Sequence, residues 1–335
     1  MTVDDKLRAL RDLVQQDVGD RGLARDPARN LVNACPDDFA AACRSIADTP
    51  DAAVGIVTGF TIPSVDPPRE ETDGPPGAWF LRRVLRSLGV RVYISAGREA
   101  VMALMLQDPV PGGYFRLPRG AGYRGLLRYS AALRESVSPL THLIALERVG
   151  PNHTPQSLRE QGATDEVVAQ FEREVPPERR DRCFTMGGRD ITDLTQPAHL
   201  LFENRGLLYF NRLVTIGIGD GGNEIGMGKI PWDVIRRNIP NGGLIACRVP
   251  TDYLIVAGVS NWGAFALGAG VALLRGERVE PELFDLGYHR LVLEEMARAA
   301  GLVDGVTGRT TATVDGLSFE QYARVLPEMG RIVNG

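Results

Sequence analysis

The sequence contains few cysteines, and none has the spacing that holds a metal ion. The chain has only Cys35, Cys43, Cys183 and Cys247, and no two of them form a Cys-x-x-Cys pair. This pattern argues against both a structural zinc site and a disulfide framework. Reduced thiols are the simplest interpretation.

Long apolar runs are also missing. No stretch reaches the ~18 apolar residues that a membrane helix needs, since the best candidate, around 253–274, is interrupted by Ser260, Asn261 and several glycines. The N-terminal segment MTVDDKLRALRDLVQQDVGD is charged and amphipathic and lacks the apolar core of a signal peptide. The sequence therefore predicts no membrane partner and a cytoplasmic protein.

Positive charge is not in excess either. The formal net charge is −4, and charged stretches such as REET (69–72) mix the two signs, which argues against a nucleic-acid partner. The proportions of apolar (44%) and charged (24%) residues are those of an ordinary globular enzyme. A small molecule is therefore the expected partner, and a homo-oligomer is left open.

Segments with helical and strand-like periodicity alternate along the chain. The spacing of apolar residues predicts helices over 4–16, 37–47, 77–89, 98–107, 195–206 and 261–276. Short apolar runs predict strands over 52–60, 90–95, 141–147 and 213–219, with LIACRV (244–249) and DYLIVAG (252–258) following. The alternation predicts an α/β fold with a mostly parallel, doubly wound sheet and helices on both faces.

Three regions stand apart from this alternation. Residues 1–48 are expected to form extra N-terminal helices that pack on an α/β domain spanning 49–335. The segment TIPSVDPPREETDGPPG (61–77) is too rich in proline and acid for a regular element and is predicted to be a loop. Residues 154–183 form a charged excursion that is expected to be helical.

Parallel sheets bind ligands at the carboxyl ends of their strands, so the strand exits are the places to search. After the first exit, VTGFTIP, come Glu71 and Asp73, two acids that would suit a hard cation. A cap formed by Thr72 or Asp73 on the following helix is the simpler interpretation of this segment alone.

The exit LERVG places Glu147 and Arg148 at the end of a buried strand. Charges of both signs there would hold a zwitterionic or carboxylate ligand, or would form an internal ion pair. Because neighbouring side chains of an extended strand point to opposite sides, the two are not expected to face the same way.

The most unusual exit is GIGDGGNEIGMGK (217–229), which places carboxylates and an amide on a glycine-rich backbone. It matches G-x-G-x-x-G, the phosphate-binding pattern, but Asp220 and Glu224 would crowd a pyrophosphate. A tight turn explains the glycines but not the acids. Oxygen ligands from Asp220, Asn223 and Glu224 fit a Mg²⁺ or Mn²⁺ site better.

Polar residues elsewhere offer weaker candidates. Ser260 and Asn261, in the exit AGVSNWG, would donate hydrogen bonds to a carboxylate at a helix N-terminus, or would simply be the N-cap. Asp304 and Asp315 precede glycines and are more typical of turns than of ligands. The histidines do not cluster. His142 is expected in the core, and the remaining three are expected at the surface: His153, His199 and His289.

Seven blocks of the sequence appear in an order that resembles the D-glutamate cyclase-like family. They are GIVTGFTIP, EETDGPPGA, LIALERVG, GIGDGGNEIGMGK, LIVAGVSNWGAFAL, DGVTG and TVDGL, and with QDVGDRGL the resemblance runs from about residue 15 to 316. Its domain occurs alone in microbes and as the C-terminal part of a vertebrate mitochondrial enzyme.

This resemblance implies dehydration of D-glutamate to 5-oxo-D-proline, or chemistry on a related small carboxylate, in a metal-associated α/β fold. It implies a divalent cation, Mg²⁺ or Mn²⁺, as Lewis acid and carboxylates as acid and base. The catalytic candidates are Asp73, Glu147, Asp220 and Glu224. The metal candidates are Glu71, Asp73, Asp220, Asn223 and Glu224. The substrate-binding candidates are Thr58, Thr72, Arg148, Arg189, Ser260 and Asn261.

The chain departs from the family pattern at one point. Relatives tend to read M-R-G-x-D-I where this chain has Met186-Gly187-Gly188-Arg189-Asp190-Ile191, so the arginine is shifted by two positions. If the arginine holds a substrate carboxylate, the preferred substrate would differ. The excursion at 154–183 also resembles an insertion near this point. A metal-dependent phosphomonoester hydrolase and a non-catalytic small-ligand binder are the alternative functions.

Overall fold

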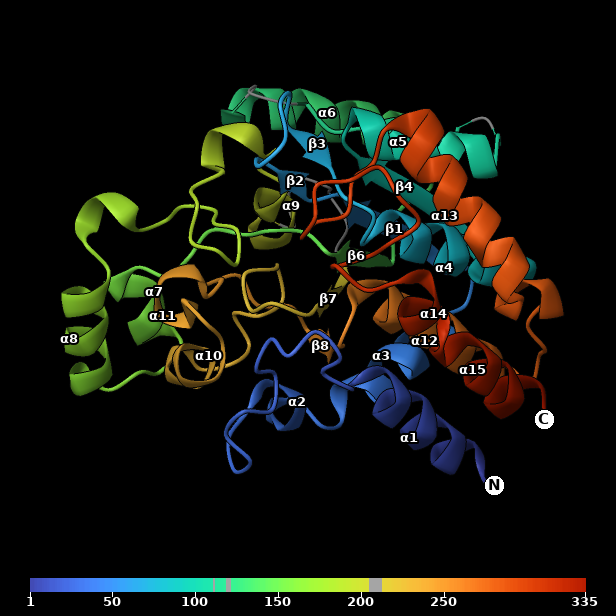
Figure 1. Ribbon diagram of the computed structural model, residues 1–335, viewed down its shortest axis with the longest axis horizontal. Coiled ribbons are helices and arrows are strands. Elements are labelled where there is room, and N and C mark those ends of the chain that lie inside the picture. The colour runs from blue at the N-terminus through green and yellow to red at the C-terminus, as the bar shows by residue number, and fades with distance from the viewer. Residues whose placement is uncertain (111, 119–121, 205–212) are drawn as a thin grey trace.

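The centre of the molecule is a six-stranded parallel sheet. A computed structural model describes residues 1–110, 112–118, 122–204 and 213–335 (Figure 1). The strand order is β5-β4-β1-β6-β7-β8, and every neighbouring pair is parallel. The strands are β1 (Ala53–Thr58), β4 (Arg91–Ala96), β5 (Tyr114–Arg116), β6 (His142–Leu146), β7 (Val214–Gly219) and β8 (Tyr253–Val256).

Helices cover both faces of this sheet, as the sequence predicts. Val54 and Ile56 of β1 join the apolar core on one face, whereas Ala53 and Val57 join the core on the other, because side chains alternate along a strand. The first core contains α1 (Val3–Val14), α3 (Asp38–Ala47), α4 (Pro75–Ser87), α5 (Arg98–Gln107), α12 (Ser260–Leu274), η4 (Pro281–Phe284), α13 (Leu286–Ala300), α14 (Phe319–Ala323) and α15 (Val325–Asn334). The second contains α2 (Leu31–Ala34), α6 (Gly122–Ser136), α7 (Pro155–Glu160), α8 (Asp165–Glu174), α9 (His199–Glu203), α10 (Trp232–Asn238) and α11 (Gly242–Ile245).

The order of the strands creates a crevice at one edge of the sheet where a ligand can bind. From β1 the chain moves outward to β4 and β5, then returns to β6 on the other side of β1 and continues to β7 and β8. The strand order therefore reverses between β1 and β6. Loops that leave two such strands diverge to opposite faces, and the crevice between them is where open α/β sheets bind ligands.

Two details differ from the sequence prediction. The segment 61–77 is not entirely loop, because β2 (Thr61–Ile62) and β3 (Arg69–Glu70) pair as a short antiparallel hairpin. The run LIACRV (244–249) is not a strand. It contains the end of α11, and the amide of Cys247 donates to the carbonyl of Gly222, so this run supports the glycine-rich loop instead of extending the sheet.

The helices predicted at 195–206 and within 154–183 are present but shorter than predicted. The helix predicted over 195–206 is the shorter α9, and residues 205–206 lie outside the described residues. Residues 154–183 hold α7, α8 and the 3-10 helix η1 (Pro177–Arg179), followed by η2 (Thr192–Leu194). The domain boundary at 48/49 and the status of 154–183 as an insertion stay predictions. Among the described residues, no helix is both long enough and apolar enough to cross a membrane.

Candidate active site

Three buried carboxylates converge where the strand order reverses. Glu147 follows β6 directly, Asp220 follows β7, and Asp73 lies between β3 and α4. One carboxylate oxygen from each of the three lies within 4.8 Å of the others. The segments 71–73 and 220–224, far apart in the sequence, thus meet at one place, as the sequence analysis expects.

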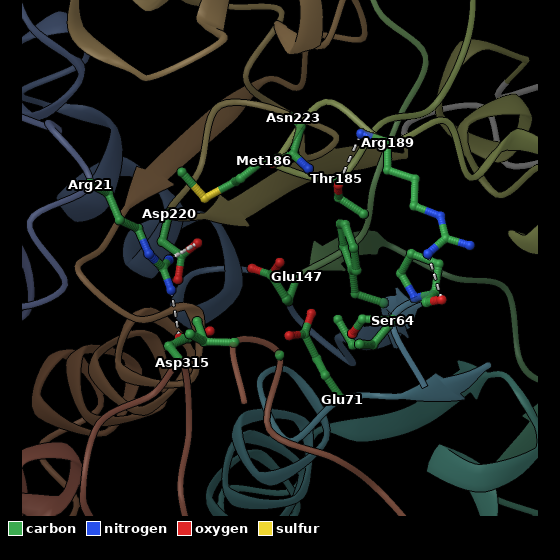
Figure 2. Close-up of a pocket in the computed structure, with 16 residues that line it drawn as sticks. Arg21, Ser64, Glu71, Glu147, Thr185, Met186, Arg189, Asp220, Asn223 and Asp315 are labelled. Atoms are coloured by element: carbon green, nitrogen blue, oxygen red, sulfur yellow. Dashed lines mark hydrogen bonds and ion pairs between the residues drawn. The ribbon is translucent and has the colours of Figure 1, made fainter. Parts of the chain in front are cut away.

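These carboxylates adjoin a cavity of about 380 Å³, a size typical of small-molecule sites (Figure 2). Figure 2 shows Glu71 and Glu147 near its centre, with Arg21, Asp220 and Asp315 on one side and Arg189 on the other. Its wall contains the side chains of Arg21, Phe60, Ile62, Pro63, Ser64, Glu71, Glu147, Thr185, Met186, Arg189, Asp220, Asn223, Val306 and Asp315, with Gly187 and Gly305.

Asp73 is fixed by the N-terminus of α12. The amide of Ser260 donates to Asp73 Oδ2 at 2.9 Å, and that of Asn261 donates to Asp73 Oδ1 at 2.8 Å. In return, Asn261 Oδ1 accepts hydrogen bonds from the amides of Gly74 and Gly77 at the start of α4. The two helices therefore cap each other, and both point their positive ends at the carboxylates.

These contacts bear on two predictions about caps. The N-cap of α4 is Gly74, and Asp73 Oδ1 accepts its amide at 2.9 Å, as the cap interpretation expects of Asp73, whereas Thr72 does not cap this helix with its side chain. Thr72 Oγ1 donates instead to the carbonyl of Thr313. Likewise Ser260 and Asn261 are not the N-cap of α12, because that position is Val259 and both residues are already helical.

Glu147 and Arg148 have different partners, although Glu147 is not in the extended conformation that the prediction assumes. Glu147 has a left-handed φ of 44°, and its Oε2 accepts a hydrogen bond from Ser260 Oγ at 2.6 Å inside the site. Arg148 is fully buried and donates to the carbonyl of Gly59 and to both oxygens of Gln196. It does not line the cavity, and the two residues form no ion pair with each other.

The glycine-rich loop after β7 is folded by its own acid. Glu224 Oε1 accepts hydrogen bonds from the amides of Asp220 at 2.9 Å and Gly221 at 2.6 Å. Glu224 itself does not line the cavity, whereas Asp220 does. A Cβ on Gly217 would lie 2.6 Å from the Cα of Gly226, so the glycines allow the two ends of the loop to touch. Asp220 is thereby held at the cavity wall.

Two further predicted residues, Asn223 and Thr58, lie beside the carboxylates. Asn223 lines the cavity, and its Nδ2 donates to the carbonyl of Phe184. Thr58 is fully buried, and its Oγ1 has no hydrogen-bond partner among the described residues. A Cβ built on Gly74 would lie 2.4 Å from Thr58 Oγ1 and 3.2 Å from Glu147 Cβ, so this hydroxyl is beside the carboxylates.

Arg21 and Asp315 also belong to the site, although the sequence does not single out Arg21 and indicates a turn residue at Asp315 rather than a ligand. Arg21 pairs with Asp220 through one guanidinium nitrogen and with Asp315, at 2.9 Å, through the other. The carboxylate of Asp17 accepts the amides of Arg21 and the two residues that follow it, which directs the arginine into the site. The only signal for Arg21 was its place in the block QDVGDRGL. Asp304, by contrast, accepts three amides and is a turn residue, as predicted.

The cavity carries an excess of negative charge. Burial, followed by repulsion from neighbouring carboxylates, raises the pKa values of Glu71, Asp73 and Glu147 well above their usual range. Burial also raises the pKa values of Asp220 and Asp315, to about 6 each, although Arg21 opposes the rise. A group of acids in this state is stabilised by protons or by an additional cation.

The donor set fits a hard divalent cation. Asp73, Glu147 and Asp220 supply carboxylate oxygens, the ligand type that Mg²⁺ and Mn²⁺ prefer. Of the predicted metal ligands, Asp73 and Asp220 belong to this cluster, Glu71 and Asn223 line the same cavity, and Glu224 folds the loop behind it.

The histidines take no part in this site. None of the four lines the cavity. His142 is buried, as predicted, but the expectation that His153 and His289 lie at the surface is wrong, because both are buried. His199 is half-buried. Among the residues that line the cavity, carboxyl groups are therefore the candidates for general acid and general base.

Arg189 is the cation on the opposite wall (Figure 2). Its Nη1 donates to the carbonyl of Pro63 at 2.8 Å, the residue is exposed, and it forms no ion pair with a described residue. An arginine in this position leaves donors free to face a ligand in the cavity.

Comparison with known proteins agrees with the sequence resemblance. The chain is 30% identical over 283 residues to the mitochondrial D-glutamate cyclase of Homo sapiens. The match covers 82% of this chain and 40% of that protein, so the chain spans less than half the length of this relative. A family described as D-glutamate cyclase-like, C-terminal, matches residues 10–330. Since this match extends over nearly the whole sequence, the chain belongs to the D-glutamate cyclase-like, C-terminal family.

Proposed function

We propose that this chain catalyses the metal-assisted intramolecular dehydration of an amino dicarboxylate, with D-glutamate as the substrate and 5-oxo-D-proline as the product. The observation that carries the proposal is the buried cluster of Asp73, Glu147 and Asp220 beside a cavity of small-molecule size. The name of the human relative supplies the substrate.

The reaction sets clear chemical requirements. The substrate amine attacks the carbon of its own side-chain carboxyl group, and one carboxyl oxygen leaves as water. The nitrogen loses two protons between the ammonium form and the lactam, and the departing oxygen gains two. Protons must therefore move within the cavity without net gain or loss, which calls for groups that both accept and donate them.

Asp73, Glu147 and Asp220 are the residues that would hold the cation. When bound, a divalent cation supplies Lewis-acid polarisation of a carboxyl group and stabilises the negative charge that develops on its oxygens. Ser260 Oγ, which donates to Glu147 Oε2, fixes the orientation of that carboxylate. The mutual caps of α4 and α12 do the same for Asp73.

Glu71 is the group best suited to move protons. It lines the cavity, its carboxylate accepts no hydrogen bond from the described residues, and burial, followed by repulsion from neighbouring acids, raises its pKa, which makes its carboxylate a stronger base. In its ionised form such a group can accept a proton from the ammonium, and in the protonated form that results it can return this proton to the leaving oxygen.

Arg189 is placed to bind the α-carboxylate of the substrate. It lies on the side of the cavity opposite Asp220, so a substrate held by Arg189 and by the carboxylate cluster would have its two carboxyl groups fixed relative to each other. Holding the reacting groups together removes much of the entropic barrier to ring closure. Because this arginine is shifted by two positions from its place in the family pattern, the dicarboxylate that this chain prefers would differ from that of its relatives.

The test is a direct search for product. Chelator-treated protein is incubated with D-glutamate, L-glutamate or a phosphomonoester, with and without Mg²⁺ or Mn²⁺, and the products are identified by mass spectrometry. We expect 5-oxoproline from D-glutamate only when the cation is present, equal turnover by the surface variant Asp165→Asn, and none by Glu147→Gln. Phosphate release without 5-oxoproline would favour the hydrolase, and no product from any substrate would favour a binding protein.

A further inference from the structure

A second hollow lies against the same loop that closes the acidic cavity. The loop 304–311 contributes Gly305 and Val306 to the cavity wall. Its later residues line a separate, more open hollow of about 560 Å³, together with Val65, Arg69, Arg298, Gly301 and Val303. The loop members of this second lining are Gly308, Arg309, Thr310 and Thr311.

The charge of this second hollow is opposite to that of the cavity. Arg69, Arg298 and Arg309 line it, and no acidic residue does. None of the three forms an ion pair with a residue that the structure describes. Arg69 donates one hydrogen bond, at 3.3 Å, to the carbonyl of Gly301 and keeps its other donors. The partial negative charge at the C-terminus of α13 balances only a fraction of three full positive charges.

The loop is shaped so that polar groups face this hollow. Asp304 is fully buried and accepts the amides of Val306 and Thr307, and its carbonyl accepts the amide of Gly308, which has a left-handed φ of 68°. This tight turn is followed at once by Arg309 and two threonines. Arginine forks and hydroxyl donors at one concave surface are the groups that proteins use to bind oxyanions.

We propose that this second hollow, lined by Arg69, Arg298, Arg309, Thr310 and Thr311, is a binding site for a small oxyanion of the phosphate or carboxylate class. The proposal is independent of the function proposed above, since it concerns a different surface and requires no turnover. In a chain of net charge −4, a wall of three arginines without acids attracts such a ligand electrostatically.

The two sites share backbone, so the oxyanion site is coupled to the cavity. Arg69 is separated from Glu71 of the cavity by a single residue of β3, and Val303, in the wall of the hollow, forms a β-bridge with Glu71. A ligand that holds Arg69 and Arg309 together restrains both segments. The segment 303–306 carries that restraint to Gly305 and Val306 in the cavity wall.

The test is calorimetric titration of the chelator-treated full chain with inorganic phosphate at low salt. Glycerol phosphate and acetate serve as further arms that separate phosphomonoesters and carboxylates from free phosphate. We expect saturable binding of at least one of the three, weakened at least tenfold by Arg69→Gln and by Arg309→Gln. Arg278→Gln, the same change at an exposed arginine outside the hollow, is expected to leave the affinity unchanged.

Hydrogen exchange gives a second readout that does not depend on affinity. The bound anion is expected to slow exchange at the amides of 306–311 in the wild-type chain and not in Arg309→Gln. Absence of saturable binding for all three anions would overturn the proposal. So would equal affinities in the Arg69, Arg309 and Arg278 variants, because the anion would then bind elsewhere.

Discussion

At the residue scale, the cavity contains several buried acids and, apart from the exposed Arg189, one arginine, Arg21. Arg21 pairs with Asp220 and Asp315, while Glu71 and Glu147 share the cavity and lack a cationic partner among the described residues. Burial disfavours the charge of Arg21, but the neighbouring acids, led by Asp220 and Asp315, more than offset this and raise its pKa above the ordinary value. The arginine therefore stays charged and neutralises only part of the site, which leaves room for a divalent cation.

The variant Asp220→Asn tests that cation directly. Asparagine keeps the volume of the side chain and can still accept the amide of Ser260, but it removes the charge that a hard cation requires. We expect loss of bound Mg²⁺ or Mn²⁺ with an unchanged circular dichroism spectrum, measured as the metal-to-protein ratio after gel filtration. Asp165→Asn, at an exposed position of α8, is the matched control, and unaltered metal content in Asp220→Asn would count against this site.

The variant Arg189→Gln tests the carboxylate anchor. Removing a charge-assisted hydrogen bond is expected to raise KM for D-glutamate at least tenfold, with a smaller change in kcat. Steady-state kinetics, with Arg278→Gln as the control for loss of a surface charge, provide the measurement. An unchanged KM would mean that the substrate carboxylate binds elsewhere.

Single residues also mark the limit of what the sequence predicts. The acids at strand exits could be found because parallel strands end at a common edge, and that rule locates Asp73, Glu147 and Asp220. Arg21 and Asp315 reach the same site from loops near the two ends of the chain, outside any strand exit. A local sequence pattern cannot predict this contact between Arg21 and Asp315, because the contact depends on how the terminal segments pack on the sheet.

At the scale of elements, periodicity predicts most helices and strands because each is amphipathic or fully buried. The predicted helix at 98–107 coincides with α5, and the predicted strand at 213–219 differs from β7 by one residue. The apolar run at 244–249 is predicted to be a strand, but it pairs only through an isolated bridge between Cys247 and Asn152. Its residues Cys247 and Val249 are instead buried in the second core, beside the glycine-rich loop. Burial alone does not distinguish a strand from a packed loop.

The exchange of caps between α4 and α12 should be a large local contribution to stability. In Asn261→Ala the amide of Gly77 loses its acceptor and the carbonyl of Thr72 loses a donor in a buried environment, while the amide of Gly74 keeps Asp73, so we expect the free energy of unfolding to fall by about 2–4 kcal/mol. Chemical denaturation provides the measurement. Ser318→Ala, which removes an exposed cap from α14, should lower it by only ~1 kcal/mol. Equal effects of the two substitutions would show that the exchange adds nothing beyond an ordinary cap.

At the scale of the whole molecule, two sets of titratable groups oppose each other as the pH changes. Burial lowers the pKa values of His142, His199 and His289 to about 4 and that of His153 to about 3. Their contribution to stability is complete above pH 6.5, the ordinary value, and is lost as the pH falls. The cavity carboxylates have raised pKa values, so their contribution is present at low pH and is lost as the pH rises. The pH profile of the wild-type protein alone therefore cannot separate the two sets.

A difference measurement isolates the carboxylates. Asp315 has an ordinary pKa of 3.8, raised mainly by burial to about 6 in the folded chain, so its favourable contribution is complete below pH 4 and is lost as the pH rises through 6. In the variant Asp315→Asn, the amide side chain mimics the protonated carboxyl group and does not titrate. In the presence of a chelator, the free energy of unfolding of this variant minus that of the wild type should therefore increase between pH 4 and pH 7, by on the order of 3 kcal/mol. Denaturant titrations across this range provide the measurement, and a flat or falling difference would show that Arg21 compensates the buried charge completely.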